Sequence, residues 1–215
     1  MPIKGIIFDL DGVIVSTDEC HYKGWKRLAD DEGIPFTWED NMRLRGVSRM
    51  QSLEFLLEKA DKTYTEEEKL EMAERKNGYY REMLQDITPD DILPGVMPIL
   101  EELKKRGIKI SIGSSSKNSP KILERIGLDN YFDATSDGND IKKGKPDPEV
   151  FLIAAERMGI PPEECLVVED AKAGVEAALN GNMKVLGVGA AQDDERAHLR
   201  ARDMASVTVD QLLSV

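Results

Sequence analysis

The sequence predicts an α/β protein: a parallel sheet with helices on both faces, and a bundle of helices inserted after the first strand. Two observations support this. Short apolar runs without polar alternation recur along the chain and are separated by helical patterns, as in doubly wound sheets whose strands are buried on both faces. Between residues 16 and 88 this alternation stops, and only helical patterns remain.

The apolar runs place the strands. The first is KGIIFDL at residues 4–10, and the later ones are IKISIGS at 108–114, ECLVVED at 164–170 and MKVLGVG at 183–189. The helical patterns between and after them each end at a glycine, a residue that often follows a helix end. These glycines are Gly107, Gly127, Gly159 and Gly181. Near the end of the chain, DDERAHLRARD at 193–203 predicts a charged surface helix.

The helical segment begins and continues with capping signals. The pairs Ser16 with Glu19, Ser48 with Gln51, and Thr65 with Glu68 have the spacing of capping boxes. We therefore predict an α/β core domain made of residues 1–15 and 89–215, and a helical cap made of residues 16–88. The two junctions of the cap lie on one face, which predicts a hinge.

Composition limits the function. The net charge is −12, which argues against nucleic acid or an anionic membrane as a partner, although a local cluster of cations can still bind phosphate. No apolar stretch approaches the roughly 20 residues that span a bilayer. Two cysteines, Cys20 and Cys165, lie far apart, which favours reduced thiols in the cytoplasm. We expect a cytoplasmic monomer.

Polar residues follow the predicted strands where each strand ends. Ligands of open α/β sheets bind at the carboxyl ends of the strands, so these residues are expected to converge. They are Asp9 and Asp11 after the first strand, Ser114 to Asn118 after the second, and Glu169 and Asp170 after a later one, with Lys145 just ahead of a helix. Asp9 and Asp11, two residues apart, are expected on one side of a strand.

Clustered carboxylates suit Mg²⁺, and a strand-end serine and a lysine suit a phosphate. Together they indicate phosphoryl transfer, with one aspartate as nucleophile and the other moving a proton. Each signal has an ordinary alternative: an exposed acidic pair, a serine loop, a surface lysine, or a helix cap. The order of all four along the chain is what favours the catalytic interpretation.

Four stretches, FDLDGVI, GSSS, KPDP and VVEDAKAGVEAA, resemble the haloacid dehalogenase superfamily of phosphotransferases. The resemblance implies a Rossmann-like core with an inserted helical cap. It makes Asp9 the nucleophile and Asp11 the general acid and base. It assigns the transferring phosphoryl group to Ser114 and Lys145. The implied ligands of Mg²⁺ are Asp9, the backbone carbonyl of Asp11, Glu169 and Asp170.

The cap stretches TDECHYKGWK, RGVSRMQSL and AERKN, together with SSSKNSP, are similar to the β-phosphoglucomutases within that superfamily. These enzymes interconvert β-glucose 1-phosphate and β-glucose 6-phosphate through a bound β-glucose 1,6-bisphosphate. The resemblance implies a substrate site made of Thr17, His21, Trp25, Gly46, Val47, Ser48, Arg49, Ser52, Lys76, Ser115, Ser116, Lys117 and Asn118. The last three of these are expected to hold the phosphate that is not transferred.

The cap residues can also be interpreted from their spacing. His21 and Trp25 are four residues apart and share a helix face, so His21 can reach the general acid and Trp25 can stack on a sugar. Arg49 lies in the first turn of a helix and can bind an anion there. Each has a structural alternative: a buried histidine, and a solvated arginine. Lys76 is either a snorkelling lysine or part of the sugar pocket.

Three other functions share parts of this pattern. A phosphatase of the same superfamily, acting on a sugar phosphate or similar metabolite, needs the same core residues and differs only in the cap. A non-catalytic sensor would not need the complete set of catalytic residues. A phosphonate hydrolase would need a cap lysine that forms a Schiff base. Lys76 could be proposed for that role, but its helical placement and its glucomutase-like neighbours argue against it.

Overall fold

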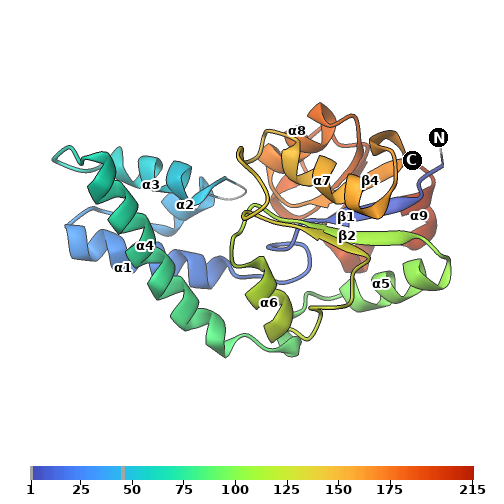
Figure 1. The fold of residues 1–215 in the computed structure, drawn as a ribbon, viewed down its shortest axis with the longest axis horizontal. Helices are drawn as coiled ribbons and strands as arrows, with labels where there is room; N and C mark the ends of the chain where they lie inside the picture. Colours follow the sequence, from blue (N-terminus) through green and yellow to red (C-terminus); the bar gives the residue numbers. More distant parts are fainter. Residues whose placement is uncertain (1, 45–46) are drawn as a thin grey trace.

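A computed structural model describes residues 2–44 and 47–215, and within them shows one parallel sheet next to a group of helices (Figure 1). The strand order is β3-β2-β1-β4-β5-β6, and all neighbouring strands are parallel. The strands are β1 Gly5–Phe8, β2 Lys109–Gly113, β3 Ala134–Ser136, β4 Cys165–Glu169, β5 Lys184–Gly187 and β6 Leu199–Arg200. The predicted α/β fold is confirmed.

The register brings the ends of the central strands to one level. Phe8, the last residue of β1, pairs with Ile112 of β2 and with Val168 of β4. Parallel strands in register end at the same edge of the sheet, so the residues that follow them are neighbours in space. This edge faces the helical cap (Figure 1).

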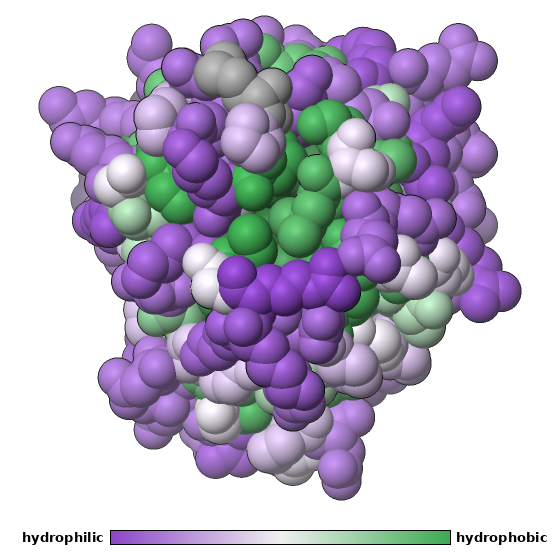
Figure 2. Space-filling model, turned by 90° about the vertical axis from the view of Figure 1, so that its right-hand side faces the viewer, coloured by the Kyte–Doolittle hydropathy of each residue, from purple (hydrophilic) through white to green (hydrophobic). Residues whose placement is uncertain are grey.

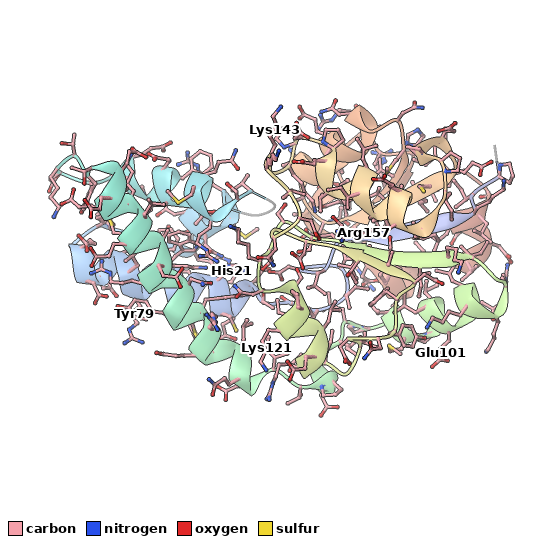
Figure 3. All side chains as sticks on the ribbon, in the orientation of Figure 1. His21, Tyr79, Glu101, Lys121, Lys143 and Arg157 are labelled. Carbon is pink, nitrogen blue, oxygen red and sulfur yellow. The ribbon has the colours of Figure 1, made fainter. Side chains whose placement is uncertain are left out.

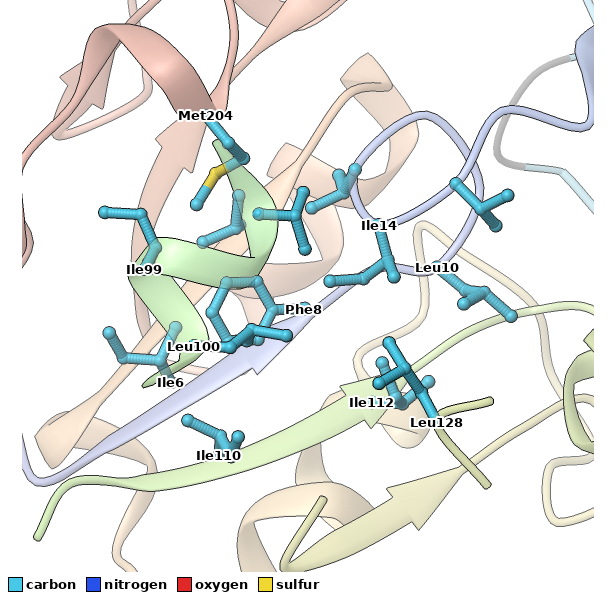
Figure 4. Close-up of a cluster of buried hydrophobic side chains, with 14 of the residues drawn as sticks. Ile6, Phe8, Leu10, Ile14, Ile99, Leu100, Ile110, Ile112, Leu128 and Met204 are labelled. Carbon is cyan, nitrogen blue, oxygen red and sulfur yellow. The ribbon is translucent and has the colours of Figure 1, made fainter. Parts of the chain in front are cut away.

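Helices cover the two faces of the sheet. They are α5 Val96–Lys105, α6 Ser119–Arg125, α7 Glu149–Met158, α8 Lys172–Asn180 and α9 Val209–Leu213. Side chains of β1 alternate between two apolar clusters: Ile6 and Phe8 pack with Leu100 of α5 (Figure 4), and Ile7 packs with Phe151 of α7. A strand buried on both faces has no polar alternation, which is why KGIIFDL reads as a continuous apolar run.

The cap is formed by α1 Asp18–Glu32, α2 Trp38–Met42, α3 Arg49–Leu57 and α4 Glu66–Met83. It has an apolar cluster of its own that includes Trp25, Leu53 and Met72. The two connections to the core run side by side, since Val15 forms an antiparallel bridge with Ile92. The division at residues 15/16 and 88/89 stays a prediction.

Short 3₁₀ helices occupy several of the connections. They are Leu84–Asp86, Pro89–Asp91, Pro162–Glu164, Gly189–Ala191 and Met204–Ser206. At the end of the molecule away from the cap, where the strands begin, the surface has an apolar hollow with a polar surround (Figure 2). Across residues 2–44 and 47–215, every helix is too short or too polar to cross a bilayer.

The capping signals are partly confirmed. Ser48 and Thr65 cap α3 and α4 with complete capping boxes. The box predicted at Ser16 is wrong: the N-cap of α1 is Thr17, which makes no side-chain cap bond. Its hydroxyl instead donates a hydrogen bond to Asp11. The threonine at the start of this helix therefore contributes to the functional site and not to the helix cap.

Two details at the end of the chain differ from the prediction. The left-handed residue after α8 is Asn182, with φ of 58°, rather than Gly181. The helix predicted at 193–203 is wrong, because His198 donates its backbone N–H to Val185 and the chain then continues as β6 beside β5. The short strands β3 and β6 were not predicted.

Candidate active site

A cavity of about 610 Å³ lies between the carboxyl edge of the sheet and the cap. Most of the predicted site residues line it: Asp9, Asp11, His21, Trp25, Val47, Ser48, Arg49, Ser52, Lys76, Ser114, Ser115, Ser116, Lys117, Asn118, Lys145 and Asp170. Thr17 and Glu169 are fully buried and contact members of this set. Gly46 lies outside the described residues.

Three carboxylates gather at the floor of the cavity. Asp9, Glu169 and Asp170 each offer an oxygen, and these oxygens lie within 4.8 Å of one another. The ammonium of Lys145 lies 2.6 Å from Asp9 Oδ1 and also donates to Glu169. Three negative charges and one positive charge leave a charge of −2 at this cluster when all four groups are ionised. One Mg²⁺, which prefers carboxylate oxygens, would neutralise it.

Local backbone structure brings these groups together. The N–H of Asp9 donates to Val168 at 2.9 Å, which extends the pairing of β1 with β4 one residue past the strand. A Cβ at Gly12, which has φ of 84°, would lie 2.2 Å from Asp170 Oδ2. A Cβ at Gly174 would lie 2.0 Å from the carboxyl group of Glu169. Glycine at both positions therefore lets the loop after Asp9 and the first turn of α8 approach the carboxylates.

Burial and charge set the ionisation of this cluster. Burial raises the pKa of Asp9 to about 7, although Lys145 opposes the shift. Burial would lower the pKa of Lys145, but Asp9 and Glu169 outweigh it and raise that pKa, so the ammonium stays charged. A divalent cation at the cluster would favour the ionised form of Asp9, which is the nucleophilic form.

Asp11 has a separate set of partners on the cap side. Its Oδ1 accepts the backbone N–H of Thr17 at 2.7 Å, and its Oδ2 accepts the Thr17 hydroxyl. The Nε2 of His21 lies 3.3 Å from the same Oδ2, so His21 reaches Asp11 as predicted. The role of this pair in proton transfer stays a prediction. The expectation that Asp9 and Asp11 share one side of a strand is wrong, because β1 ends at Phe8 and Asp11 lies in the turn that follows.

These partners keep Asp11 ionised. Burial would raise the pKa of Asp11, but the hydrogen bonds from His21 and Thr17 outweigh burial and lower it. The pKa of His21 is lowered by burial and by the neighbouring Lys76. Asp11 is therefore ionised, and its contacts with Thr17 and with His21 of α1 (Figure 3) connect it to the cap.

Lys76 is buried rather than snorkelling, with 3% of its surface exposed. Its Nζ lies 2.9 Å from His21 Nδ1 and 4.8 Å from the ring centroid of Trp25. Burial and the charge of Arg49 lower the pKa of Lys76 to about 7. Trp25 is only 2% exposed and packs in the cap cluster. Trp25 also lines the cavity, and its stacking on a sugar stays a prediction.

Hydroxyl and amide groups line the core wall above the acidic cluster. Ser114 Oγ accepts the N–H of Ser116 at 3.1 Å, and Ser116 Oγ accepts the N–H of Asn118 at 3.2 Å. The Oγ of Ser115 is buried without a hydrogen-bond partner among the described residues. Such an unpaired hydroxyl at a cavity wall suits a bound oxygen-rich ligand such as phosphate.

The cap wall carries Arg49, the first residue of α3, whose Nη1 lies 3.4 Å from Glu74 Oε2. The amide of Asn118 donates to Asn77 Oδ1 at 2.9 Å, which joins the core to α4 of the cap. Glu74, Asn77 and Tyr80 were not predicted as site residues. A signal was available, since Tyr80 lies four residues after Lys76 on the same face of a helix.

The sequence matches the haloacid dehalogenase-like hydrolase family over residues 3–182. The chain belongs to this family. Family membership confirms the resemblance that the motifs indicated.

Relatives within the family include mutases and phosphatases. The chain is 42% identical to a β-phosphoglucomutase of Bacillus subtilis (strain 168), over 98% of this chain and 94% of that protein. It is 33% identical to a phosphorylated carbohydrates phosphatase of Thermotoga maritima, over 99% and 98%. The crystal structure of a β-phosphoglucomutase from Clostridium difficile matches with a TM-score of 0.91 and 39% identity, over 97% and 95%.

Proposed function

We propose that this protein is a β-phosphoglucomutase. It interconverts β-glucose 1-phosphate and β-glucose 6-phosphate through an aspartyl-phosphate at Asp9 and a β-glucose 1,6-bisphosphate intermediate. One observation carries the proposal: Asp9, Ser114 and Lys145 of the core and Arg49 of the cap line a single cavity, which supports a nucleophile with a phosphate site on the core wall and a second anion site on the cap wall. A bisphosphate has to be held at both ends, and a simple phosphatase needs only the first site.

The acidic cluster fits a magnesium ion. Asp9, Asp170 and the backbone carbonyl of Asp11 would hold it. Glu169 already accepts Lys145 and the N–H of Ala171, so it would contribute less to the metal and more to the position of Lys145. When bound, Mg²⁺ supplies positive charge that offsets the charge on the transferring phosphoryl oxygens.

The residues of this chain then divide the reaction into two transfers. With Asp9 phosphorylated, Asp11 takes the proton of the attacking sugar hydroxyl while the phosphoryl group moves to that hydroxyl. The bisphosphate turns and presents its other phosphate. Asp9 attacks this second phosphorus, and Asp11 gives the same proton to the leaving oxygen. Lys145 and Ser114 hold the phosphoryl oxygens, and Arg49 and Lys117 hold the other phosphate.

Exclusion of water favours a mutase over a phosphatase. The contact between Asn118 and Asn77 closes the cap on the core, and a closed site passes the phosphoryl group to the sugar rather than to solvent. The phosphatase remains the second candidate function, because a phosphatase relative matches almost the full chain.

We also propose that β-glucose 1,6-bisphosphate activates the enzyme and that one chain acts alone in the cytoplasm.

The test is a coupled assay that starts from β-glucose 1-phosphate, with Mg²⁺ and a trace of β-glucose 1,6-bisphosphate. We expect β-glucose 6-phosphate to form much faster than free phosphate, and activity to disappear with EDTA or in Asp9→Asn. Release of phosphate without isomerisation would instead identify a phosphatase.

A further inference from the structure

Tyr80 of α4 lies directly behind Asp11, the proton-transfer group of the proposed reaction. Its side chain is 1% exposed. The phenol hydroxyl donates to Thr17 Oγ1 at 3.0 Å. The ring stacks on the imidazole of His21 with 4.2 Å between centroids and an interplanar angle of 29°. Tyr80 therefore contacts both residues that contact Oδ2 of Asp11.

The direction of these hydrogen bonds is informative. Thr17 has one hydroxyl proton, and this proton is donated to Asp11. The Thr17 oxygen is therefore left as an acceptor, and Tyr80 supplies the donor. A chain of hydroxyl groups that all donate toward one carboxylate polarises each bond and fixes the rotor of the middle group.

Packing alone does not explain the hydroxyl of Tyr80. The ring belongs to the large apolar cluster and lies near Leu84. A phenylalanine would fill the same volume, whereas a buried hydroxyl carries a desolvation cost that only its hydrogen bond offsets. The hydroxyl bonds to Thr17, 63 positions earlier in the chain, across the junction between α1 and α4.

We propose that Tyr80 is a positioning residue for proton transfer: it holds Thr17 and His21 on Oδ2 of Asp11 so that this carboxylate faces the reacting sugar hydroxyl in one orientation. The inference rests on the proposed role of Asp11. It adds a residue of the cap that acts on Asp11 through two others.

The test separates a step that needs Asp11 from a step that does not. Acetyl phosphate can phosphorylate Asp9 without any proton transfer, because acetate leaves as a stable anion. Transfer from phospho-Asp9 to β-glucose 1-phosphate needs a proton to move from the sugar hydroxyl to Asp11. Both half-reactions can be followed in rapid-quench experiments with ³²P-labelled enzyme.

In Tyr80→Phe we expect the second half-reaction to slow by about 10-fold, a fraction of the 10²–10⁴-fold that general acid–base catalysis contributes. The rate of phosphorylation by acetyl phosphate and the KM for the sugar phosphate should not change. Tyr79→Phe is the matched control, since Tyr79 is the adjacent residue of α4, points to the outer surface (Figure 3) and donates to Asp31 at 2.8 Å.

Equal slowing of both half-reactions in Tyr80→Phe, or no slowing of either, would overturn the inference. The proposed function is judged separately in the wild type. If the wild-type phosphoenzyme reacts with water but not with the sugar, the mutase proposal fails. The role of Tyr80 is then tested by comparing the rates at which water hydrolyses phospho-Asp9 in Tyr80→Phe and in the wild type.

A spectroscopic readout is independent of turnover. The chain has two histidines, so the ring ¹⁵N signals of His21 can be assigned against those of His198. We expect Tyr80→Phe to shift the His21 signals and Tyr79→Phe to leave them unchanged. Unshifted His21 signals in Tyr80→Phe would contradict the positioning role.

Discussion

At the scale of single residues, Lys145 shows how one side chain can hold a charged site together. It is 1% exposed and lies between Asp9 and Glu169, while Asp170 adds a third carboxylate nearby. Buried carboxylates without a counter-charge are strongly unfavourable, so Lys145 serves the stability of the core as well as the binding of phosphate.

Lys145→Ala is therefore expected to abolish phosphoryl transfer and to lower the free energy of unfolding by about 3–5 kcal/mol, the usual effect of breaking a buried ion pair. Saturating Mg²⁺ should restore part of this loss, since it adds positive charge to the same carboxylates. Denaturant unfolding with and without Mg²⁺ measures both effects. Lys143→Ala, which removes an exposed lysine 3.7 Å from Asp147, is the control and should unfold like the wild type.

In the proposed reaction, Glu74 and the second phosphate of the substrate compete for Arg49 on the cap wall of the cavity. Its carboxylate lies 3.4 Å from Arg49, at the position where the proposal places the second phosphate of the substrate. The Glu74 side chain is 69% exposed, so the pair is weak. Substrate binding has to replace this contact.

Glu74→Gln should lower the KM for β-glucose 1-phosphate by about two- to fivefold, because an exposed ion pair contributes under about 1 kcal/mol. The kcat should stay unchanged. Steady-state kinetics at two salt concentrations would check this, since screening should reduce the difference. Glu71→Gln, on the exposed surface of the same helix, should leave the KM unchanged. A KM that rises in Glu74→Gln would show that the carboxylate helps substrate binding.

At the scale of elements, α4 carries most of the cap side of the site. Its residues Lys76 and Tyr80, one turn apart, both face the cavity and both contact His21. The helix is capped by Thr65 and its last turn packs into the core cluster, so it is anchored at both ends. A rigid helix can hold a buried lysine that a loop would release to solvent.

Burying Lys76 reduces stability in a pH-dependent way. Its folded-state pKa of about 7 lies below the ordinary 10.5, so between these values the unfolded chain binds more protons. The free energy of unfolding then rises with pH in this window, and the penalty is complete below about pH 7. Lys76→Met should therefore raise the free energy of unfolding at pH 7 by several kcal/mol, because one pKa unit corresponds to about 1.4 kcal/mol. The Tm at pH 7 should rise with it.

The gain in Tm should shrink as the pH rises from 7 toward 10. Thermal unfolding of both proteins across this range is the measurement. Lys69→Met, which replaces a lysine with the nearby partners Glu54 and Glu66, is the control and should not stabilise the protein. A constant difference in Tm between Lys76→Met and the wild type would mean that Lys76 has an ordinary pKa.

At the scale of the whole molecule, the cap and the core meet over the cavity. The amide of Asn118, after β2, donates to Asn77 of α4. Gly144 of the core also lies close to Ser48, the N-cap of α3. The two connecting segments pair through Val15 and Ile92. The cap therefore contacts the core beside the cavity as well as through the two connecting segments.

Asn77→Ala should favour the open form. One hydrogen bond contributes a net of about 1 kcal/mol, which corresponds to an about fivefold shift of the equilibrium between closed and open forms. We expect hydrolysis of phospho-Asp9 to increase relative to transfer to sugar. The ratio of phosphate release to mutase turnover measures this. Asn180→Ala, which removes an amide bonded at 3.0 Å to Pro146 within the core, should leave the ratio unchanged.

The sequence by itself determined the strands and the chemistry at their ends. Apolar runs such as KGIIFDL are local signals of buried strands, and parallel strands place whatever follows them at one edge. For that reason Asp9, Ser114 and Asp170 could be assigned to one site without coordinates. The short strands β3 and β6 and the absence of a helix around His198 were missed, because their formation depends on pairing with β2 and β5 rather than on local pattern.

Only the tertiary structure decided which cap residues are buried and what they contact. Helical spacing shows that Lys76 and Tyr80 share a face, but it cannot show that this face packs against His21 and Thr17 of another helix. The same holds for Trp25, whose ring the cap interior covers, and for Thr17, whose hydroxyl serves Asp11 instead of a helix cap. These outcomes depend on contacts between residues far apart in the chain, and such contacts leave no periodic pattern in the sequence.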